Sequence, residues 1–486
     1  MKISLLPKTF VLVACLLSAL SVAAYDFVSG GIYYKITSSA NMTVEVTYYS
    51  KTNNTYSGTV TIPEKVTTDG KTYYVTAIGE YAFVGCSGLR GVNFTSERTT
   101  KIGNYAFQGC NGMTSFYFPA HIASVGNYAF SACYGLASIT FEESTTSLSL
   151  GYGSSKGQGY SLFYDCPLES LYITRPLSYS AGSSYGYSPF ALVKTLKKVR
   201  FGSVVKAIWE YLFTGCSSLN TLEYDNQCKP TEIRKYAFWD CDALTESNIH
   251  YPETVTTIGE GVFQACSSLT SYTIPNHVTT VGSYAFRSCT NLANIVIKPS
   301  VTSIGNYAFN GCTALTGVTI EEAETTLSLG YNDNNPGKGL FYDCPLYSVF
   351  IGRPLSYSAS SGYGYSPFAN NTTLVKSRLG KLLTSIPNYI FYGCTYLDEV
   401  TSCAAMPPTA NANCFANYDA RLYVPMNSVN AYKNANVWKD FSSITGVDIP
   451  DDGDPIIPSG ITGDVNGDGV VNITDVADLI EMLLNK

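Results

Sequence analysis

Apolar residues recur along most of the chain at a fixed spacing. Ile-Gly-x-Tyr-Ala-Phe-x-Gly-Cys, or a close variant, is followed by Leu-x-x-apolar-x-apolar. The steps between copies are mostly 23 to 25 residues, and four longer steps of 27 to 33 residues carry inserted loops. A fixed period in this range predicts a solenoid. The repeat phenylalanines are Phe83, Phe107, Phe130, Phe163, Phe190, Phe213, Phe238, Phe263, Phe286, Phe309, Phe341, Phe368, Phe391 and Phe415.

Each repeat predicts two short strands and a turn. Leu89-Arg-Gly-Val92-Asn-Phe94 alternates with period two, as expected of a strand with one buried face. A second apolar pair, as in Val301-Thr-Ser-Ile304, predicts a shorter strand. We expect Tyr-Ala-Phe to form a tight helical or 3₁₀ turn that inserts its Phe into the core. The prediction is therefore a repeat solenoid of about 14 coils, hydrogen-bonded from coil to coil.

This repeated phrase resembles the BspA-type leucine-rich repeat of bacterial surface proteins, from about residue 75 to 447. Residues 25–74 resemble the β-rich N-terminal cap of such arrays, and 422–441 resemble their closing segment. The resemblance implies an extracellular leucine-rich repeat array that acts in adhesion or recognition.

The N-terminus predicts a secretory signal peptide over residues 1–24. Lys2 and Lys8 precede a short apolar run over 9–20, and small residues follow at 22–24. The run is too short to span a bilayer, and no later segment is apolar enough to do so. A lipidation box ending at Cys15 is an alternative. We therefore expect an exported protein with no transmembrane span.

The C-terminus predicts a calcium loop after a linker over residues 448–462. In residues 463–475, Asp464, Asn466 and Asp468 occupy loop positions 1, 3 and 5, Val470 offers its carbonyl at position 7, and Asp475 is position 12. An amphipathic helix over 476–484 follows. Residues 463–486 thus predict an EF-hand-like loop and helix, and they resemble a type I dockerin repeat, which implies Ca²⁺ and a cohesin partner. Dockerins normally have two such repeats, and this chain has one.

Eleven cysteines lie three residues after a repeat Phe. Export favours disulfides, but Val193 and Asn371 fill the same slot in other repeats, which favours packed free thiols. We expect free thiols in this ladder. A Cys403–Cys414 bridge, off the ladder, remains an open alternative.

A block of the array is duplicated, with residues 124–194 recurring at 303–376. In strands with one buried face, the alternate residues point outward. We predict two ligand patches, one in each copy, for a glycan or an acidic protein surface on a host. Each patch combines an outward aromatic residue, the arginine that follows it and the cations of the next coil. Tandem copying without a selected site, and tyrosines that merely pack over their coils, are the alternatives. The patches comprise Tyr172, Arg175, Lys198 and Arg200 in one copy and Phe350, Arg353, Lys376 and Arg378 in the other.

Composition narrows the function. Charged residues make up 14% and the formal net charge is −7, which argues against a nucleic-acid-binding surface. The chain has three histidines, which argues against a metal site or a catalytic mechanism that needs several imidazoles. A G-x-S-x-G match at 153–157 lacks the flanking strand and helix of a nucleophile elbow. We expect a non-enzymatic recognition protein. The alternatives are a dockerin-bearing component of an extracellular polysaccharide-degrading complex, and an enzyme whose site the sequence does not reveal.

Overall fold

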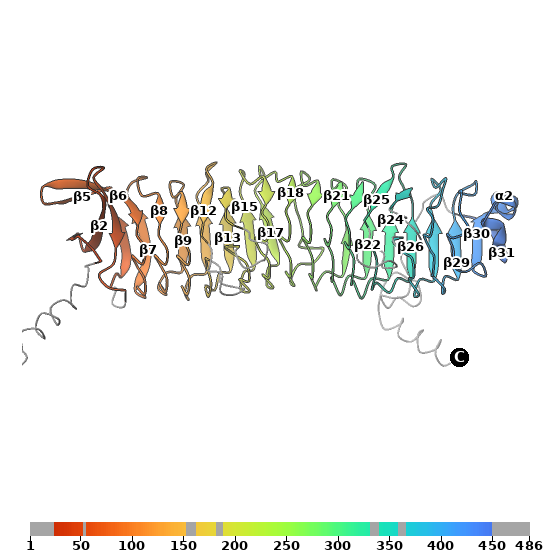
Figure 1. The fold of residues 1–486 in the computed structure, drawn as a ribbon, viewed down its shortest axis with the longest axis horizontal. Helices are drawn as coiled ribbons and strands as arrows, with labels where there is room; N and C mark the ends of the chain where they lie inside the picture. Colours follow the sequence, from red (N-terminus) through yellow and green to blue (C-terminus); the bar gives the residue numbers. More distant parts are fainter. Residues whose placement is uncertain are drawn as a thin grey trace, which may run out of the picture.

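The computed structural model describes residues 24–51, 55–151, 162–180, 188–330, 340–357 and 366–449. They form one elongated solenoid of about 13 turns (Figure 1). The fourteenth repeat phenylalanine, Phe415, stacks on Phe391 with centroids 5.7 Å apart. Its ring also lies 5.6 Å from Trp438 and 5.1 Å from Phe441 of the closing segment. Residues 1–23 of the predicted signal peptide, 450–462 of the linker and the dockerin-like tail lie outside the described residues.

The N-terminal cap is β-rich, as predicted. The antiparallel pairs are β1–β2, β2–β3 and β5–β6, while β3 pairs with β6 in parallel. β4 (Gly58–Ile62) pairs in parallel with β7 (Leu89–Phe94), so the ladder of the array begins inside the range assigned to the cap. The other cap strands are β1 (Phe27–Ser29), β2 (Ile32–Ser38), β3 (Thr43–Thr47), β5 (Lys65–Thr68) and β6 (Lys71–Ile78).

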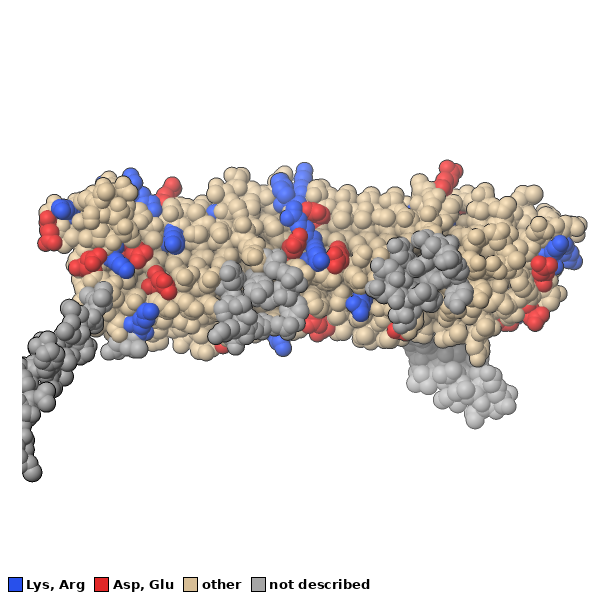
Figure 2. Space-filling model, viewed as in Figure 1, with Lys and Arg blue, Asp and Glu red and all other residues tan. Residues whose placement is uncertain are grey.

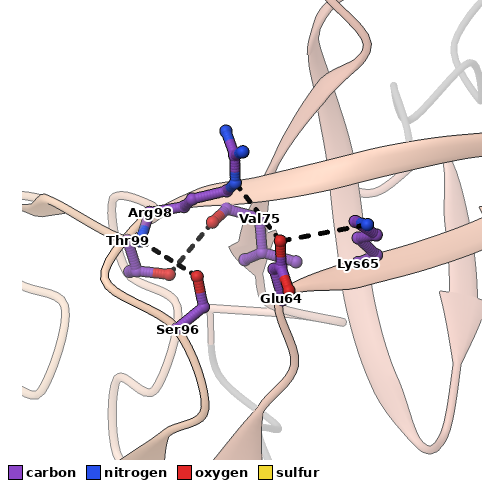
Figure 3. Close-up of polar contacts among 6 residues, drawn as sticks. All are labelled: Glu64, Lys65, Val75, Ser96, Arg98 and Thr99. Carbon is purple, nitrogen blue, oxygen red and sulfur yellow. Dashed lines mark hydrogen bonds and ion pairs between the residues drawn. The ribbon is translucent and has the colours of Figure 1, made fainter.

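Polar contacts fasten this cap to the array (Figure 3). Arg98 Nε donates to Glu64 Oε1 at 3.3 Å, and Thr99 Oγ1 donates to the Val75 carbonyl at 3.0 Å. The Arg98 guanidinium also lies 4.2 Å from the centroid of the Tyr74 ring. The loop after β7 is therefore held against β6 and against Glu64, the residue that precedes β5.

The longer strand of each repeat joins a parallel ladder with its neighbours. Beyond the β4–β7 pair, two sheets result. They are interrupted between β17 and β20, where Glu246 accepts hydrogen bonds from Ser271 Oγ and the Thr273 amide at 2.6 and 2.7 Å. One sheet contains β9 (Ser115–Phe118), β11 (Ser138–Phe141), β13 (Ser170–Ile173), β15 (Lys198–Phe201) and β17 (Thr221–Tyr224). The other contains β20 (Ser271–Thr273), β22 (Asn294–Ile297), β24 (Gly317–Ile320), β26 (Ser348–Ile351), β28 (Lys376–Leu379), β29 (Glu399–Ser402), β30 (Arg421–Pro425) and β31 (Ser443–Val447).

The second strand of the repeat is shorter, as predicted, and forms its own parallel ladders. The first ladder continues the sheet of the cap through β8 (Lys101–Ile102), β10 (Ser124–Val125), β12 (Leu148–Leu150) and β14 (Leu177–Ser178). The second contains β16 (Ala207–Ile208), β18 (Glu232–Ile233), β19 (Thr257–Ile258), β21 (Thr280–Val281), β23 (Ser303–Ile304), β25 (Leu327–Leu329) and β27 (Leu355–Ser356).

The Tyr-Ala-Phe segment is a hydrogen-bonded turn without helix in the coils that the structure describes, which differs from the expected helical or 3₁₀ form. Its tyrosine adopts a positive φ, for example 54° at Tyr105, so the backbone turns its N–H groups toward the next coil. Tyr105 N and Phe107 N donate to the carbonyls of Asn127 and Ala129 at 2.9 and 2.7 Å. The turns therefore form a third ladder, and the repeat phenylalanines stack inside it as predicted, with Phe286 and Phe309 centroids 5.5 Å apart.

The ladder cysteines are free thiols, as predicted, and so are the other cysteines among the described residues. Where another repeat Phe precedes the coil of a ladder thiol, the thiol donates to the carbonyl of that earlier Phe. Cys110 Sγ lies 3.0 Å from the Phe83 carbonyl and Cys289 Sγ lies 3.1 Å from the Phe263 carbonyl. The thiol thus acts as a small buried donor that links neighbouring coils, and Cys403 and Cys414 are not bridged.

The chain closes with short helices packed on the last strands. They are η3 (Met426–Ser428), α2 (Val429–Asn434) and η4 (Trp438–Asp440). Tyr432 Oη donates to the Ala404 carbonyl at 2.9 Å and Trp438 Nε1 to the Pro408 carbonyl at 2.7 Å. Two large buried rings therefore seal the end of the core.

Candidate functional site

Six of the eight predicted patch residues lie on the strands where they were expected, and Arg175 and Arg353 do not. Tyr172 on β13 is directly beside Arg200 on β15, and Phe350 on β26 is directly beside Arg378 on β28. Tyr172 and Phe350 thus occupy equivalent strand positions in the two copies. Between the outward residues, Leu171 and Val199 point into the core, as the period of two requires.

The first copy holds a fixed cluster that spans three strands. Tyr172 Oη donates to Asp225 Oδ2 at 2.7 Å, and Arg200 Nε donates to Asp225 Oδ1 at 2.6 Å. The Arg200 guanidinium lies 4.8 Å from the centroid of the Tyr172 ring, within the range of a cation–π contact. The hydrogen bond to Asp225 raises the pKa of Tyr172, and the same carboxylate raises the pKa of Arg200. We call Tyr172, Arg200 and Asp225 the tyrosine–arginine cluster.

Sequence reasoning missed Asp225. It is the first residue after β17, at the end of the coil next to Arg200. Asp225 could have been predicted from its position. It directly follows a strand, and the neighbouring strand carries an outward arginine.

Charges of both signs surround this cluster. Lys198 Nζ pairs with Glu223 at 2.7 Å and Lys197 Nζ pairs with Glu169 at 3.0 Å, and these side chains are about half exposed. A hollow of about 490 Å³ lies over Arg200, Glu223 and Asp225. The face seen in Figure 2 is mostly uncharged, with Lys, Arg, Asp and Glu gathered near the middle and toward both ends.

The second copy does not reproduce the cluster. Phe350 has no hydroxyl and is 3% exposed. Cys403, the first residue after β29, stands in the place of Asp225, and Arg378 Nε donates to its sulfur at 3.2 Å. Lys376 pairs with Glu399 at 3.6 Å. The two copies share a backbone and a register but present different surfaces.

Arg175 and Arg353 do not belong to an exposed patch, because both are 0% exposed. Arg175 donates to the carbonyl oxygens of Thr146 and Pro119, and Arg353 donates to that of Pro299 at 2.7 Å and to that of Val301. Burial lowers the pKa of both guanidinium groups. Each arginine follows its strand by two residues, where the chain has turned inward, so the expectation that it lies beside the outward aromatic is wrong.

The described loop tyrosines pack on the array. Tyr179 Oη donates to the Glu210 carbonyl at 2.7 Å, and Tyr357 Oη donates to the Asn388 carbonyl at 2.6 Å. These two positions agree with the alternative that the loop tyrosines merely pack over the coils. The other loop tyrosines of the duplicated block lie outside the described residues.

The predicted calcium ligands Asp464, Asn466, Asp468, Val470 and Asp475 also lie outside the described residues. Within the ranges that the structure describes, there is no cluster of three or more His, Cys, Asp or Glu side chains placed to hold a metal. In those same ranges no helix has the length and apolar character needed to cross a membrane.

A model of the BspA type leucine rich repeat region matches residues 60–178, 156–250, 231–363 and 327–445. No curated protein matches this chain. Among solved structures, a leucine-rich repeat protein from Bacteroides ovatus is 21% identical with a TM-score of 0.52, over 87% of this chain and 100% of that chain. A leucine rich cell surface protein from Faecalibacterium prausnitzii is 19% identical with a TM-score of 0.31, over 77% of this chain and 94% of that one.

The matched ranges together cover residues 60 to 445, which is most of the chain, and they coincide with the parallel ladders. The Bacteroides ovatus structure shares the fold. The chain belongs to the BspA-type leucine-rich repeat family.

Proposed function

We propose that this protein is an exported, non-enzymatic recognition or adhesion protein, and that the tyrosine–arginine cluster on the outer strand face is its ligand contact. The single observation that supports this is the rigid arrangement of Tyr172, Arg200 and Asp225 on an accessible face. A ring and a guanidinium held in place by a shared carboxylate lose little conformational entropy when a ligand binds. Tyr and Arg are also the residue types that dominate binding hot spots.

The charges around the cluster favour a protein surface as the ligand. Each exposed cation named here has an acidic partner in the array, so the patch is close to neutral and carries both signs. A partner that presents both positive and negative groups can replace these ion pairs one for one. A purely acidic ligand would instead be repelled by the carboxylates of the patch. A host protein fits this pattern better than an acidic glycan.

The proposal is tested by binding of the mature chain to arrays of host surface proteins and of glycans. The double variant Lys198→Ala with Arg200→Ala should weaken binding to the best array partner by about tenfold or more, as expected for loss of a hot-spot residue. Arg421→Ala is the matched control, because Arg421 is an exposed, acid-paired cation on β30 of the same face. Equal losses in both variants, or a glycan as the only binder, would contradict the assignment.

The tail supports a second candidate function. Oxygen side chains at positions 1, 3 and 5, a glycine at 6 and an acid at 12 suit Ca²⁺. We propose that Asp464, Asn466, Asp468, the Val470 carbonyl and Asp475 hold Ca²⁺. A calcium-loaded repeat could join the protein through a cohesin to an extracellular polysaccharide-degrading complex, and a cohesin binding screen with and without Ca²⁺ tests that role.

A further inference from the structure

The outer face of β24 and β26 is closed to solvent although it points away from the core. Thr319 on β24 is 8% exposed, and Ser348 and Phe350 on β26 are 1% and 3% exposed. Their counterparts Thr140, Ser170 and Tyr172 in the first copy all stay partly exposed. The two blocks have nearly the same sequence and the same register, so the repeat alone does not account for this difference.

The chemistry of this face also differs from that of the first copy. Phe350 replaces a tyrosine, and Gly317 replaces Ser138. Ser348 Oγ is buried and has no hydrogen-bond partner. The result is an apolar ring beside small residues, a surface against which another element can pack closely. We call Gly317, Thr319, Ser348 and Phe350 the β24–β26 face.

The described chain leaves the array beside this face. A groove of about 370 Å³ next to it is lined by Phe350 and Arg378, and also by Val447, Asp448 and Ile449 at the end of the described chain. Ile449 is the last described residue, and 37 residues follow it. β26 is four strands from β31, or about 19 Å at the usual strand spacing. A linker of 13 residues over 450–462 can extend over about 45 Å.

The segment that follows the linker has the complementary chemistry. In 476–484, Val476, Leu479, Ile480 and Leu483 recur at the spacing of one apolar helix face. Residues 450–486 contain eight acidic residues and one lysine. Arg378, Lys381 and Glu322 line the groove, and Lys381 already pairs with Glu322 at 4.0 Å, so the apolar contact and not net charge favours this segment.

We propose that the C-terminal segment 463–486 of the same chain docks on the β24–β26 face, with the apolar side of residues 476–484 against Phe350. Docking removes an apolar patch from water and places the predicted calcium loop at a fixed position on the array. It also makes the two duplicated blocks functionally unequal, because the first stays open to ligands while the second carries the tail. This proposal does not depend on the ligand proposed above.

Site-specific photo-crosslinking in the full mature chain tests it. Phe350 is replaced by p-benzoylphenylalanine, and the cross-linked peptides are identified by mass spectrometry. The expected result is a cross-link to residues 463–486 in a species that migrates as a monomer. The matched control carries the same probe at Tyr172, the equivalent position of the first copy, and should give no link to the tail. No link from Phe350 to the tail, a link from both sites, or a link found only in a dimer whose yield rises with concentration would overturn the proposal.

A second measurement leaves the array sequence intact. The double variant Leu479→Asp with Leu483→Asp changes only the tail, and it should abolish the cross-link from Phe350. Hydrogen–deuterium exchange adds a readout without a probe. Exchange of the peptide 476–484 should become about tenfold faster in Phe350→Asp than in wild type, and should not change in Tyr172→Asp. Equal exchange in all three proteins would contradict docking on this face.

Discussion

Arginines that look equivalent in the sequence have opposite roles in the structure. Arg200 lies within β15, so the alternation of the strand correctly predicts that its side chain points outward. Arg175 lies two residues beyond β13, where the chain turns and the alternation no longer applies. Its guanidinium turns inward and donates to carbonyls of two preceding coils. Side-chain direction could therefore be predicted from the sequence within a strand, but not past its end.

Arg175→Ala should destabilise the array because it removes the buried guanidinium that donates to the carbonyl oxygens of Thr146 and Pro119. Hydrogen bonds that involve a charged group contribute about 1.5–3 kcal/mol each, so a loss of about 2–4 kcal/mol in the free energy of unfolding is expected. Urea denaturation followed by circular dichroism measures it. Arg200→Ala serves as the exposed control and should leave the urea midpoint unchanged. Identical midpoints for the two variants would show that the buried arginine contributes no more than the exposed one.

At the scale of the coil, the periodicity of the sequence was sufficient to predict the two strands and the core, but it was not sufficient to predict the conformation of the turn. Period-two alternation and the recurring Phe gave the buried side of each strand and the aromatic stack correctly. The positive φ of the repeat tyrosine was not predictable from its residue type, since tyrosine rarely adopts it. Among the described coils, Gly261 occupies the same position with φ of 61°, and a glycine there is a sequence signal of that backbone geometry.

The cost of the left-handed tyrosines is offset by contacts between coils. The Tyr105 and Tyr128 rings stack with centroids 5.1 Å apart, and the amides of the turn gain carbonyl partners in the next coil. Both terms require a neighbour, so a coil is stable only within the stack.

Phe286→Ala should create a cavity between two neighbouring rings. Phe286 is 0% exposed, and its centroid lies 5.6 Å from that of Phe263 and 5.5 Å from that of Phe309. Such a truncation costs about 3–5 kcal/mol, and the damage should spread to the adjacent coils. Thermal unfolding measures the loss, and hydrogen exchange should show faster exchange in β20 to β24. Thr313→Ala, on an exposed turn of a neighbouring coil, is the control. An unchanged melting temperature for Phe286→Ala would contradict the stacked core.

At the scale of the whole molecule, the thiol ladder predicts a dependence of stability on alkaline pH. Burial raises the pKa of Cys86 to about 11 and that of Cys289 to about 12, against about 8.5 in an unfolded chain. The folded state therefore keeps its protons to higher pH than the unfolded state. Their contribution to stability is complete below about pH 8.5 and is lost as the pH rises toward 11.

Urea midpoints measured under reducing conditions should accordingly fall between pH 8 and pH 10.5. Tyrosines with raised pKa values, such as Tyr34, act in the same direction at the upper end of this range. Cys289→Val removes one ionisable group and should reduce the slope of stability against pH. A midpoint that is constant across this range would mean that the thiols are accessible to solvent in the folded array.

The tail makes a separate prediction about the assembled protein. Asp464→Ala together with Asp468→Ala should abolish Ca²⁺ binding, because two of the three side-chain oxygen ligands before the loop glycine are lost. Titration calorimetry measures binding, and circular dichroism should show an unchanged array. Asp451→Ala with Asp452→Ala in the linker is the charge-matched control. Undiminished Ca²⁺ affinity in the loop variant would contradict the assignment of these ligands.

The donation of ladder thiols to phenylalanine carbonyls in the preceding coil determines how this protein would lose its fold in an oxidising medium. While the stack is closed, the sulfurs are shielded and protonated, and oxidants cannot reach them. Once several coils open, neighbouring sulfurs become thiolates in an oxidising medium and pair at random, and the parallel stack cannot close again around such bridges. Unfolding is then irreversible. In such a medium the working lifetime of the array is set by the rate at which it first opens, and not by the equilibrium between folded and unfolded chains.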